Sequence, residues 1–252
     1  MKIALVQYNP VWEDKEANKK KILELIGDTE SCELLIFPEM SLTGFSMEPQ
    51  KIGEGIGGAS FRFFSELALD KKTNVMAGIV EKRKERYYNT LIHIKPDGKF
   101  LKLYRKVHPF SYSGEEKQYS AGARPALSKI RKWKIGLTIC YDLRFPEIFR
   151  KYGKKRAHII INIANWPDTR VEHWRTLLKA RATENQCYIA AVNRVGDDPK
   201  LHYNGFSSVF DPMGKELISV ENEEKLIQVD LNKNYVNEVR EKFPFLEDVK
   251  LI

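Results

Sequence analysis

WKIGLTICYDLRFPE, residues 133–147, is the segment from which the rest of the chain is best interpreted. The apolar run at residues 135–139 predicts a buried strand, Cys140 follows at its end, and Pro146 marks where a helix can begin. The N-terminus of a helix carries partial positive charge, which favours the thiolate form of a nearby cysteine. A lone cysteine at a strand end more often packs as a small apolar side chain. Other segments must therefore distinguish a nucleophile from a core residue.

Length and composition predict one cytoplasmic domain. The 252 residues are 42% hydrophobic, which is enough for a sizeable core, and we expect residues 1–252 to form a single domain. Cys32, Cys140 and Cys187 are odd in number and lie in or beside apolar runs, which favours a reducing compartment over a disulfide framework. The chain opens on the strand-like segment KIALVQY, and no apolar run approaches the ~20 residues of a membrane span. We therefore expect no signal peptide and no membrane anchor.

The net charge of +8 does not predict a nucleic-acid binding protein. The 42 basic residues are interleaved with 34 acidic residues and are not gathered in one block. The densest basic cluster, residues 151–156, follows a predicted helix and is typical of a solvated last helical turn. The positive charge remains compatible with a preference for small anionic substrates.

Apolar periodicity predicts about eleven strands and five helices in mixed order. Hairpins are expected around residues 96–98 and 211–214, beside strand–helix–strand units, which favours an α/β sandwich with mixed sheets. Residues 107–128 are expected to form a long loop. A helix reaching to about Gln186 is expected to begin at Asp168 or Thr169, with Glu172 in the capping-box position after Thr169.

Three polar side chains lie at or just beyond the ends of separate predicted strands: Glu39, Lys106 and Cys140. Loops at strand ends are held by a rigid scaffold and often carry function. A carboxylate can take the thiol proton, and an ammonium can stabilise the charge on a carbonyl oxygen, so the three form a complete set for acyl transfer. Each also has a structural interpretation, as a loop acid, a surface base and a core residue.

The segments FPEMSLTGF, YRKVHPF and LTICYDLRFPE, in that order, resemble the three signature blocks of the nitrilase superfamily of carbon–nitrogen hydrolases. NWP, HWRTLLKARATENQCYIAAVNRVG, DPMG and REKFP also fit, so the resemblance spans nearly the whole chain and is nearest to the bacterial ω-amidase-like members. It implies a four-layer αββα sandwich with two mixed sheets. It also implies a homodimer or higher homo-oligomer, and the C-terminal residues 232–252, with Phe243, Phe245 and Leu246, could cover either a partner or the parent domain.

The resemblance implies a role for each of these residues. Glu39 would be the general base, Lys106 the cation that stabilises the oxyanion, and Cys140 the nucleophile that forms a thioester. The backbone N–H of Tyr141 would be a second oxyanion donor. The family also uses another glutamate after the lysine, and Glu115 fits best by its spacing, although the adjacent Glu116 remains open.

The implied reaction is hydrolysis of the side-chain amide of 2-oxoglutaramate or 2-oxosuccinamate, with release of ammonia. Another nitrilase-family amidase, an N-carbamoyl hydrolase or a true nitrilase would use the same residues, and a non-catalytic binding protein on the same fold is a remote alternative. No cofactor is implied. His93, His108, His158, His173 and His202 show no metal-ligand spacing, so no metal is expected.

Two further residues are candidates for substrate binding. Arg144 could bind a substrate carboxylate bidentately, or it could form a structural ion pair with Asp142 or Glu147. Trp166, at the end of a predicted strand, could wall the pocket or could simply pack in the core. An anionic small-molecule amide is the expected substrate.

Overall fold

The computed structural model describes residues 1–27 and 31–251, and its first sheet contains six strands. In spatial order the sheet runs β13-β1-β2-β3-β4-β5, in which β1, β2 and β3 are parallel and the other pairs are antiparallel. The strands are β1 (Lys2–Gln7), β2 (Leu34–Ile36), β3 (Asn74–Arg83), β4 (Arg86–Ile94), β5 (Phe100–Arg105) and β13 (Lys225–Asp230). The predicted hairpin around residues 96–98 joins β4 to β5.

The second sheet contains seven strands and has the spatial order β10-β11-β9-β8-β7-β6, with β12 paired to β11. Its centre, β7, β8 and β9, is parallel, and the outer pairs are antiparallel. The strands are β6 (Ala126–Ile130), β7 (Trp133–Ile139), β8 (Ile159–Ala164), β9 (Tyr188–Asn193), β10 (Val195–Asp197), β11 (His202–Phe210) and β12 (Glu216–Glu221). The parallel centre places the C-terminal ends of β7 and β8 side by side.

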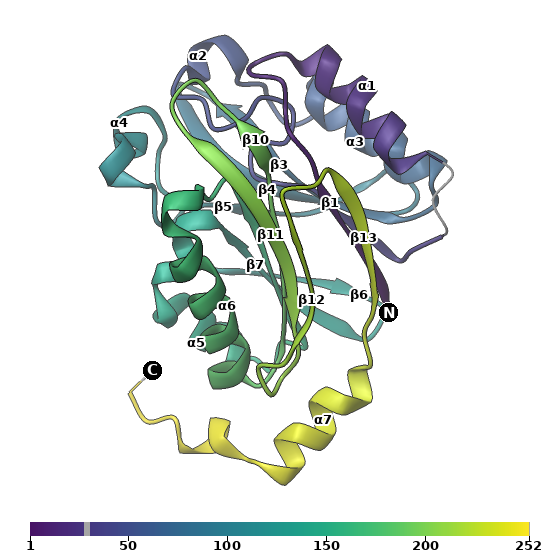
Figure 1. The fold of residues 1–252 in the computed structure, drawn as a ribbon, viewed down its shortest axis with the longest axis vertical. Coiled ribbons are helices and arrows are strands. Elements are labelled where there is room, and N and C mark those ends of the chain that lie inside the picture. The colour runs from purple at the N-terminus through teal and green to yellow at the C-terminus, as the bar shows by residue number, and fades with distance from the viewer. Residues whose placement is uncertain (28–30, 252) are drawn as a thin grey trace.

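The two sheets are packed between two layers of helices. Helices α1 (Lys15–Ile26) and α3 (Ala59–Asp70) cover the first sheet, and α5 (Pro146–Lys154) and α6 (Val171–Asn185) cover the second (Figure 1). Alternate residues of β1 show why: Ile3 and Leu5 join the core between the sheets, whereas Ala4 and Val6 pack in the core under α1 and α3. The predicted αββα sandwich with two mixed sheets is confirmed.

The described residues form seven α-helices and thirteen strands, two more of each than the sequence predicts. Besides α1, α3, α5 and α6, the helices are α2 (Pro49–Ile52), α4 (Glu115–Gln118) and α7 (Lys233–Lys242). The predicted loop at 107–128 holds α4 and the start of β6, because β6 pairs antiparallel with β7 along the edge of the second sheet. The short β10 pairs with the start of β11. Both strands are short and lie at the edges of the second sheet, and their pairing with the next strand, rather than an apolar pattern of their own, makes them strands, so periodicity alone does not predict them.

The predicted start of α6 is wrong by a few residues. Asp168–Arg170 forms a 3-10 turn (η3), and α6 begins at Val171 without a side-chain cap. The carboxylate of Asp168 accepts a hydrogen bond from the N–H of Thr169 instead. Trp166 Nε1 donates to the carbonyl of Arg170 at 2.8 Å, which holds the turn against the strand end.

The C-terminal segment packs partly on the parent domain. Leu246, in the 3-10 turn Phe245–Asp248 (η4), is buried, Phe243 is half-buried, and Phe245 is 63% exposed. Ile252, the last residue of the predicted segment, lies outside the described residues. In the part of the chain that the structure describes, no helix is long and apolar enough to cross a membrane.

Candidate active site

Cys140 follows β7 directly and begins a 3-10 turn, Cys140–Arg144 (η2). Its φ of 44° lies in the left-handed region, which a non-glycine side chain rarely adopts and which is common at functional sites. The turn is held by the buried carboxylate of Asp142, which accepts hydrogen bonds from the N–H of Ile139 at 3.0 Å and from Tyr104 OH at 2.6 Å. The other oxygen of Asp142 accepts from the N–H and the Nδ1 of His108. The backbone at the cysteine is therefore clamped to the end of β5.

Lys106, which follows β5, lies buried between two carboxylates. Its Nζ donates to Glu39 Oε1 at 2.9 Å and to Glu115 Oε2 at 2.8 Å. Asn89 Nδ2, from β4, donates to the same two carboxylates, at 2.6 Å to Glu39 and 2.9 Å to Glu115. All four side chains are at most 1% exposed. Glu116 is exposed, so the structure places Glu115, the residue favoured by spacing, against Lys106.

Burial and neighbouring charges together shift the pKa values of this cluster. Burial alone would lower the pKa of Lys106, but attraction to Glu115 and Glu39 outweighs it, and the pKa is raised above the ordinary value of 10.5. Burial raises the pKa of the Glu115 carboxyl, although Lys106 opposes this. Burial, together with the nearby charge of Glu39, also raises the pKa of the Cys140 thiol well above 9.0. The resting site therefore contains a thiol and a charged ammonium.

Asn165, which follows β8, connects Glu39 to Cys140. Its backbone N–H donates to Glu39 Oε2 at 2.9 Å, and its Nδ2 donates to the Glu39 carbonyl at 2.8 Å. Its own carbonyl accepts the Cys140 thiol at a Sγ to O distance of 3.8 Å. Because β7 and β8 are parallel and adjacent, the cysteine and the asparagine lie at the same edge of the sheet. The base candidate and the thiol thus share one partner.

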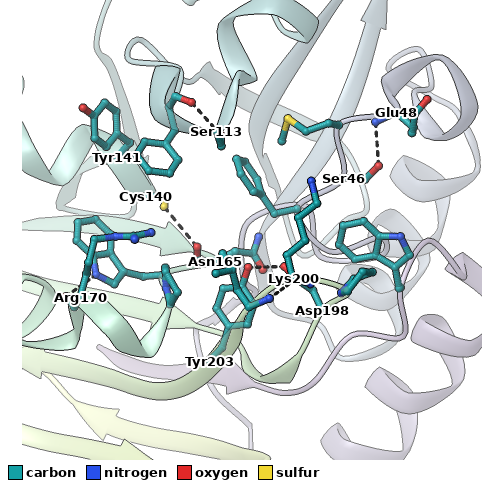
Figure 2. Close-up of a pocket in the computed structure, with 18 of the residues that line it drawn as sticks. Ser46, Glu48, Ser113, Cys140, Tyr141, Asn165, Arg170, Asp198, Lys200 and Tyr203 are labelled. Carbon is teal, nitrogen blue, oxygen red and sulfur yellow. Dashed lines mark hydrogen bonds between the residues drawn. The ribbon is translucent and has the colours of Figure 1, made fainter.

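A cavity of about 430 Å³ opens over Cys140. Figure 2 shows Cys140 and Tyr141 on one side of it and Asp198, Lys200 and Tyr203 on the other. Aromatic side chains form much of its wall: Trp12, Phe45, Phe110, Tyr141, Trp166 and Tyr203. A small organic molecule fits such a volume, with the thiol at its surface.

Arg144 and Trp166 both line this cavity. The Arg144 guanidinium lies over the Trp166 ring, 4.7 Å from its centroid, and its Nη2 is 3.3 Å from Nδ1 of His173. Within the described residues Arg144 forms no ion pair with Asp142 or Glu147, and Asp142 is already bound by Tyr104 and His108. The structural ion pair considered for Arg144 is therefore wrong.

Trp166 fulfils both of the interpretations left open for it. It is 3% exposed, lines the cavity and packs against Trp174 at a centroid distance of 5.5 Å. Tyr141 follows Cys140, and its ring lies 4.8 Å from that of Phe110. Because Tyr141 is the second residue of η2, its backbone N–H lies next to Cys140 in the same turn.

Four residues of the site lie outside the predicted set: Asn89, Asn165, Arg170 and Lys200. Asn89 is one polar residue in the strand RYYNTLIHI, and Asn165 begins the segment NWP directly after β8. Arg170, the last residue of η3, and Lys200, in the turn between β10 and β11, also line the cavity. Buried asparagines within or directly after apolar strands are the signal that could have identified the first two, because a buried amide requires polar partners.

The predicted absence of a metal site was based on the histidines. His93 is buried between Ser128 and Asn74, and burial lowers its pKa to about 4. His108 is bound to Asp142. Among residues 1–27 and 31–251, no group of three or more His, Cys, Asp or Glu side chains is arranged to hold a metal ion.

Comparison with known proteins agrees with this geometry. A family model described as carbon–nitrogen hydrolase matches residues 2–241. The chain is 32% identical over 251 residues to the 2-oxoglutaramate amidase of Bacillus subtilis (strain 168), covering 98% of this chain and 97% of that enzyme. It is 34% identical over 263 residues to the omega-amidase YafV of Escherichia coli (strain K12), covering 98% and 96%.

Solved structures show the same likeness. A CN-hydrolase superfamily protein from Xanthomonas campestris superposes with a TM-score of 0.94 at 30% identity, over 100% of this chain and 98% of that one. A branch 10 member of the nitrilase superfamily from Saccharomyces cerevisiae has a TM-score of 0.87 at 28% identity, over 97% and 94%. The resemblance predicted from the three sequence blocks is confirmed, and the chain belongs to the carbon–nitrogen hydrolase family.

Proposed function

We propose that this protein is an amidase that hydrolyses the side-chain amide of a 2-oxo acid, 2-oxoglutaramate or 2-oxosuccinamate, through a thioester on Cys140. The observation that carries the proposal is the buried ammonium of Lys106 between Glu39 and Glu115, next to a half-buried thiol at the floor of a cavity. The names of the amidase relatives supply the substrate class.

In the first half-reaction Glu39 takes the proton of Cys140, and the sulfur attacks the amide carbon. The raised pKa of the thiol is the reason that a base is required. The negative charge on the amide oxygen is stabilised by Lys106 and by the N–H of Tyr141. The C–N bond then breaks, the nitrogen takes the proton from Glu39, and ammonia leaves a thioester behind.

In the second half-reaction Glu39 takes a proton from water, and the water oxygen attacks the thioester carbon. The C–S bond breaks, Glu39 passes the proton taken from water to the sulfur, and the 2-oxo dicarboxylate is released. Glu115 keeps Lys106 charged throughout, because its carboxylate is one of the two that raise the pKa of the lysine. Asn89 keeps the two carboxylates apart by donating one N–H to each.

The charges around the cavity support an anionic substrate. Arg144, Arg170 and Lys200 line it, and within the described residues none of the three forms an ion pair with a carboxylate. Three acidic side chains also line the cavity: Glu13 is paired with Lys51, Asp198 accepts a hydrogen bond from Tyr203 OH, and Glu48 is exposed. We assign Arg144 to the carboxylate of the substrate and Trp166 to the wall beside it.

We further propose that residues 1–252 act as one catalytic domain in the cytoplasm, as a homodimer or higher homo-oligomer, without a nucleic-acid partner. The three free cysteines support a reducing compartment. The exposed Phe245 supports an apolar contact beyond the single chain.

A substrate panel tests the proposed function. Ammonia release is measured with 2-oxoglutaramate, 2-oxosuccinamate, glutamine, an N-carbamoyl amino acid and a simple nitrile. We expect the highest kcat/KM with one of the two 2-oxo acid amides, because in this panel only they carry both a side-chain amide and a 2-oxo acid group. A preference for the N-carbamoyl amino acid would make the protein a carbamoyl hydrolase with the same site. Ammonia release from none of them would reject the proposal.

A further inference from the structure

A second cavity, of about 540 Å³, lies at the far end of the second sheet, beside α7. Lys132 and Lys134 border it at the start of β7, His158 immediately precedes β8, and Lys233 and Arg240 come from α7. Because β7 and β8 are parallel, this cavity lies at their N-terminal ends, and Cys140 and Asn165 lie at their C-terminal ends. Figure 1 shows α7 at the foot of the sandwich, apart from the helices that cover the sheets.

This α7 cavity has an excess of positive charge. Five of its ten lining residues are Lys or Arg, whereas 42 of the 252 residues in the chain are. Its two acidic residues are Glu241 and Glu247. Glu247 Oε1 forms an ion pair with Arg156 Nη2 at 3.3 Å. Within residues 1–27 and 31–251, no carboxylate pairs with Lys132 or Lys233. The lining thus carries five cations and two carboxylates; cations in excess over carboxylates repel one another, and a bound anion relieves that repulsion.

Arg240 is the buried cation of this cavity. It is 8% exposed, and its Nη2 donates to the carbonyls of Ala157 and Asn185. Its Nε has no hydrogen-bond partner in the described structure. Two carbonyl dipoles satisfy hydrogen bonds but do not neutralise a full charge. The guanidinium therefore contributes an uncompensated positive charge to the wall of the cavity.

His158 supplies a hydrogen-bond donor to the same cavity. The ring is 9% exposed, and its Nδ1 accepts the backbone N–H of Lys134 at 2.9 Å, so the proton of the neutral ring lies on Nε2. Burial, and then the charges of Lys233, Arg240 and Lys134, lower the pKa of His158 to about 4. Among the described residues Nε2–H has no acceptor. The lining thus offers ammonium, guanidinium and imidazole donors.

We propose that the α7 cavity is a binding site for a small phosphate-bearing anion, separate from the catalytic cavity. A phosphate group carries about two negative charges and several acceptor oxygens, which match lysine ammoniums acting as point charges from different elements. A carboxylate is matched best by the free planar fork of an arginine. Neither arginine here offers one, because Arg156 holds Glu247 and Arg240 holds two carbonyls. The volume accommodates more than one phosphate group.

The test follows His158 in the intact protein by NMR. Its imidazole signals are recorded across pH, without ligand and with inorganic phosphate, pyrophosphate or ADP, at one ionic strength set with sodium chloride. We expect a saturable shift with a Kd of about 1 mM or tighter for pyrophosphate or ADP, and a His158 pKa raised by about one unit. Tighter binding of ADP than of pyrophosphate would mean that the cavity also contacts the nucleoside. Tighter binding of pyrophosphate would mean that it recognises the phosphate groups alone. No saturable shift with any of the three overturns the proposal.

Two variants separate a site from a general salt effect. Lys134→Gln combined with Lys233→Gln removes two cations from the cavity without touching the buried Arg240, and we expect it to weaken pyrophosphate binding at least tenfold. Lys102→Gln removes an exposed lysine of β5 outside the cavity lining and is expected to leave binding unchanged. Equal losses in the two proteins would mean non-specific screening and would also overturn the proposal.

Discussion

Replacing Lys106 by methionine removes the cation between two buried carboxylates. Glu39 and Glu115 would then face each other, with only the amide of Asn89 between them. Removing one partner of a buried ion pair costs about 3–5 kcal/mol of unfolding free energy, because the remaining charge stays uncompensated. We expect a loss of this size at about pH 8.

The loss of unfolding free energy in Lys106→Met should be larger at high pH than at low pH. Burial already raises the pKa of Glu115 above 4.5, and the attraction of Lys106 opposes that rise. Without the lysine the folded-state pKa rises further, so the variant is most stable below the unfolded value near 4.5 and loses stability as the pH rises through the new folded value. For one proton the slope is about 1.4 kcal/mol per pH unit. The difference between wild type and variant should therefore shrink as the pH falls.

Urea unfolding of both proteins at about pH 5 and about pH 8 measures this difference. Lys102→Met is the matched control: Lys102 lies on β5 and is exposed, so its replacement should change stability by less than about 0.5 kcal/mol at either pH. A loss for Lys106→Met that is the same at both pH values, or below about 1 kcal/mol at pH 8, would refute the reasoning. Turnover should fall by about 10²–10³, the effect of losing one oxyanion donor.

Three further predictions concern single residues. Arg144→Gln should lower kcat/KM for 2-oxoglutaramate by about 10- to 100-fold, mainly through KM, because a charged hydrogen bond is worth about 1.5–3 kcal/mol. Steady-state kinetics with a neutral amide should show no such loss. Asp142→Asn should lower the free energy of unfolding in urea by about 2–4 kcal/mol. Both oxygens of Asp142 accept hydrogen bonds, and in the variant an NH2 group would replace one of them and face the same donors. Glu115→Gln should lower kcat at least ~100-fold, whereas Glu116→Gln should stay within about twofold in the ammonia assay.

The parts of the fold that were predictable are those with a local pattern. The apolar run before Cys140 and the one before Glu39 are buried on both faces, so they stand out as strands, and the polar residue after each stands out as well. Lys106, the third residue of the set, was identified with the help of the family block YRKVHPF. The short edge strand β6 was not predictable, because its pairing with β7 and not its own composition makes it a strand.

The inner shell of the site depends on three-dimensional contacts that no local pattern encodes. Asn89 lies in the middle of β4 and reaches Glu39 only because β3 and β4 are neighbours in the first sheet. Spacing favoured Glu115 but left Glu116 open, since the two are adjacent on one short helix. The contact between Glu115 and Lys106 Nζ at 2.8 Å distinguishes them.

The central claim is that Cys140 carries the acyl group. Wild-type protein is quenched in acid during turnover of 2-oxoglutaramate, digested, and the acylated peptide is identified by mass spectrometry. The account predicts a 2-oxoglutaryl thioester on the peptide that contains Cys140, and neither adduct nor ammonia release from a folded Cys140→Ala variant. An adduct on Cys32 or Cys187, or ammonia release by Cys140→Ala at the wild-type rate, would contradict it.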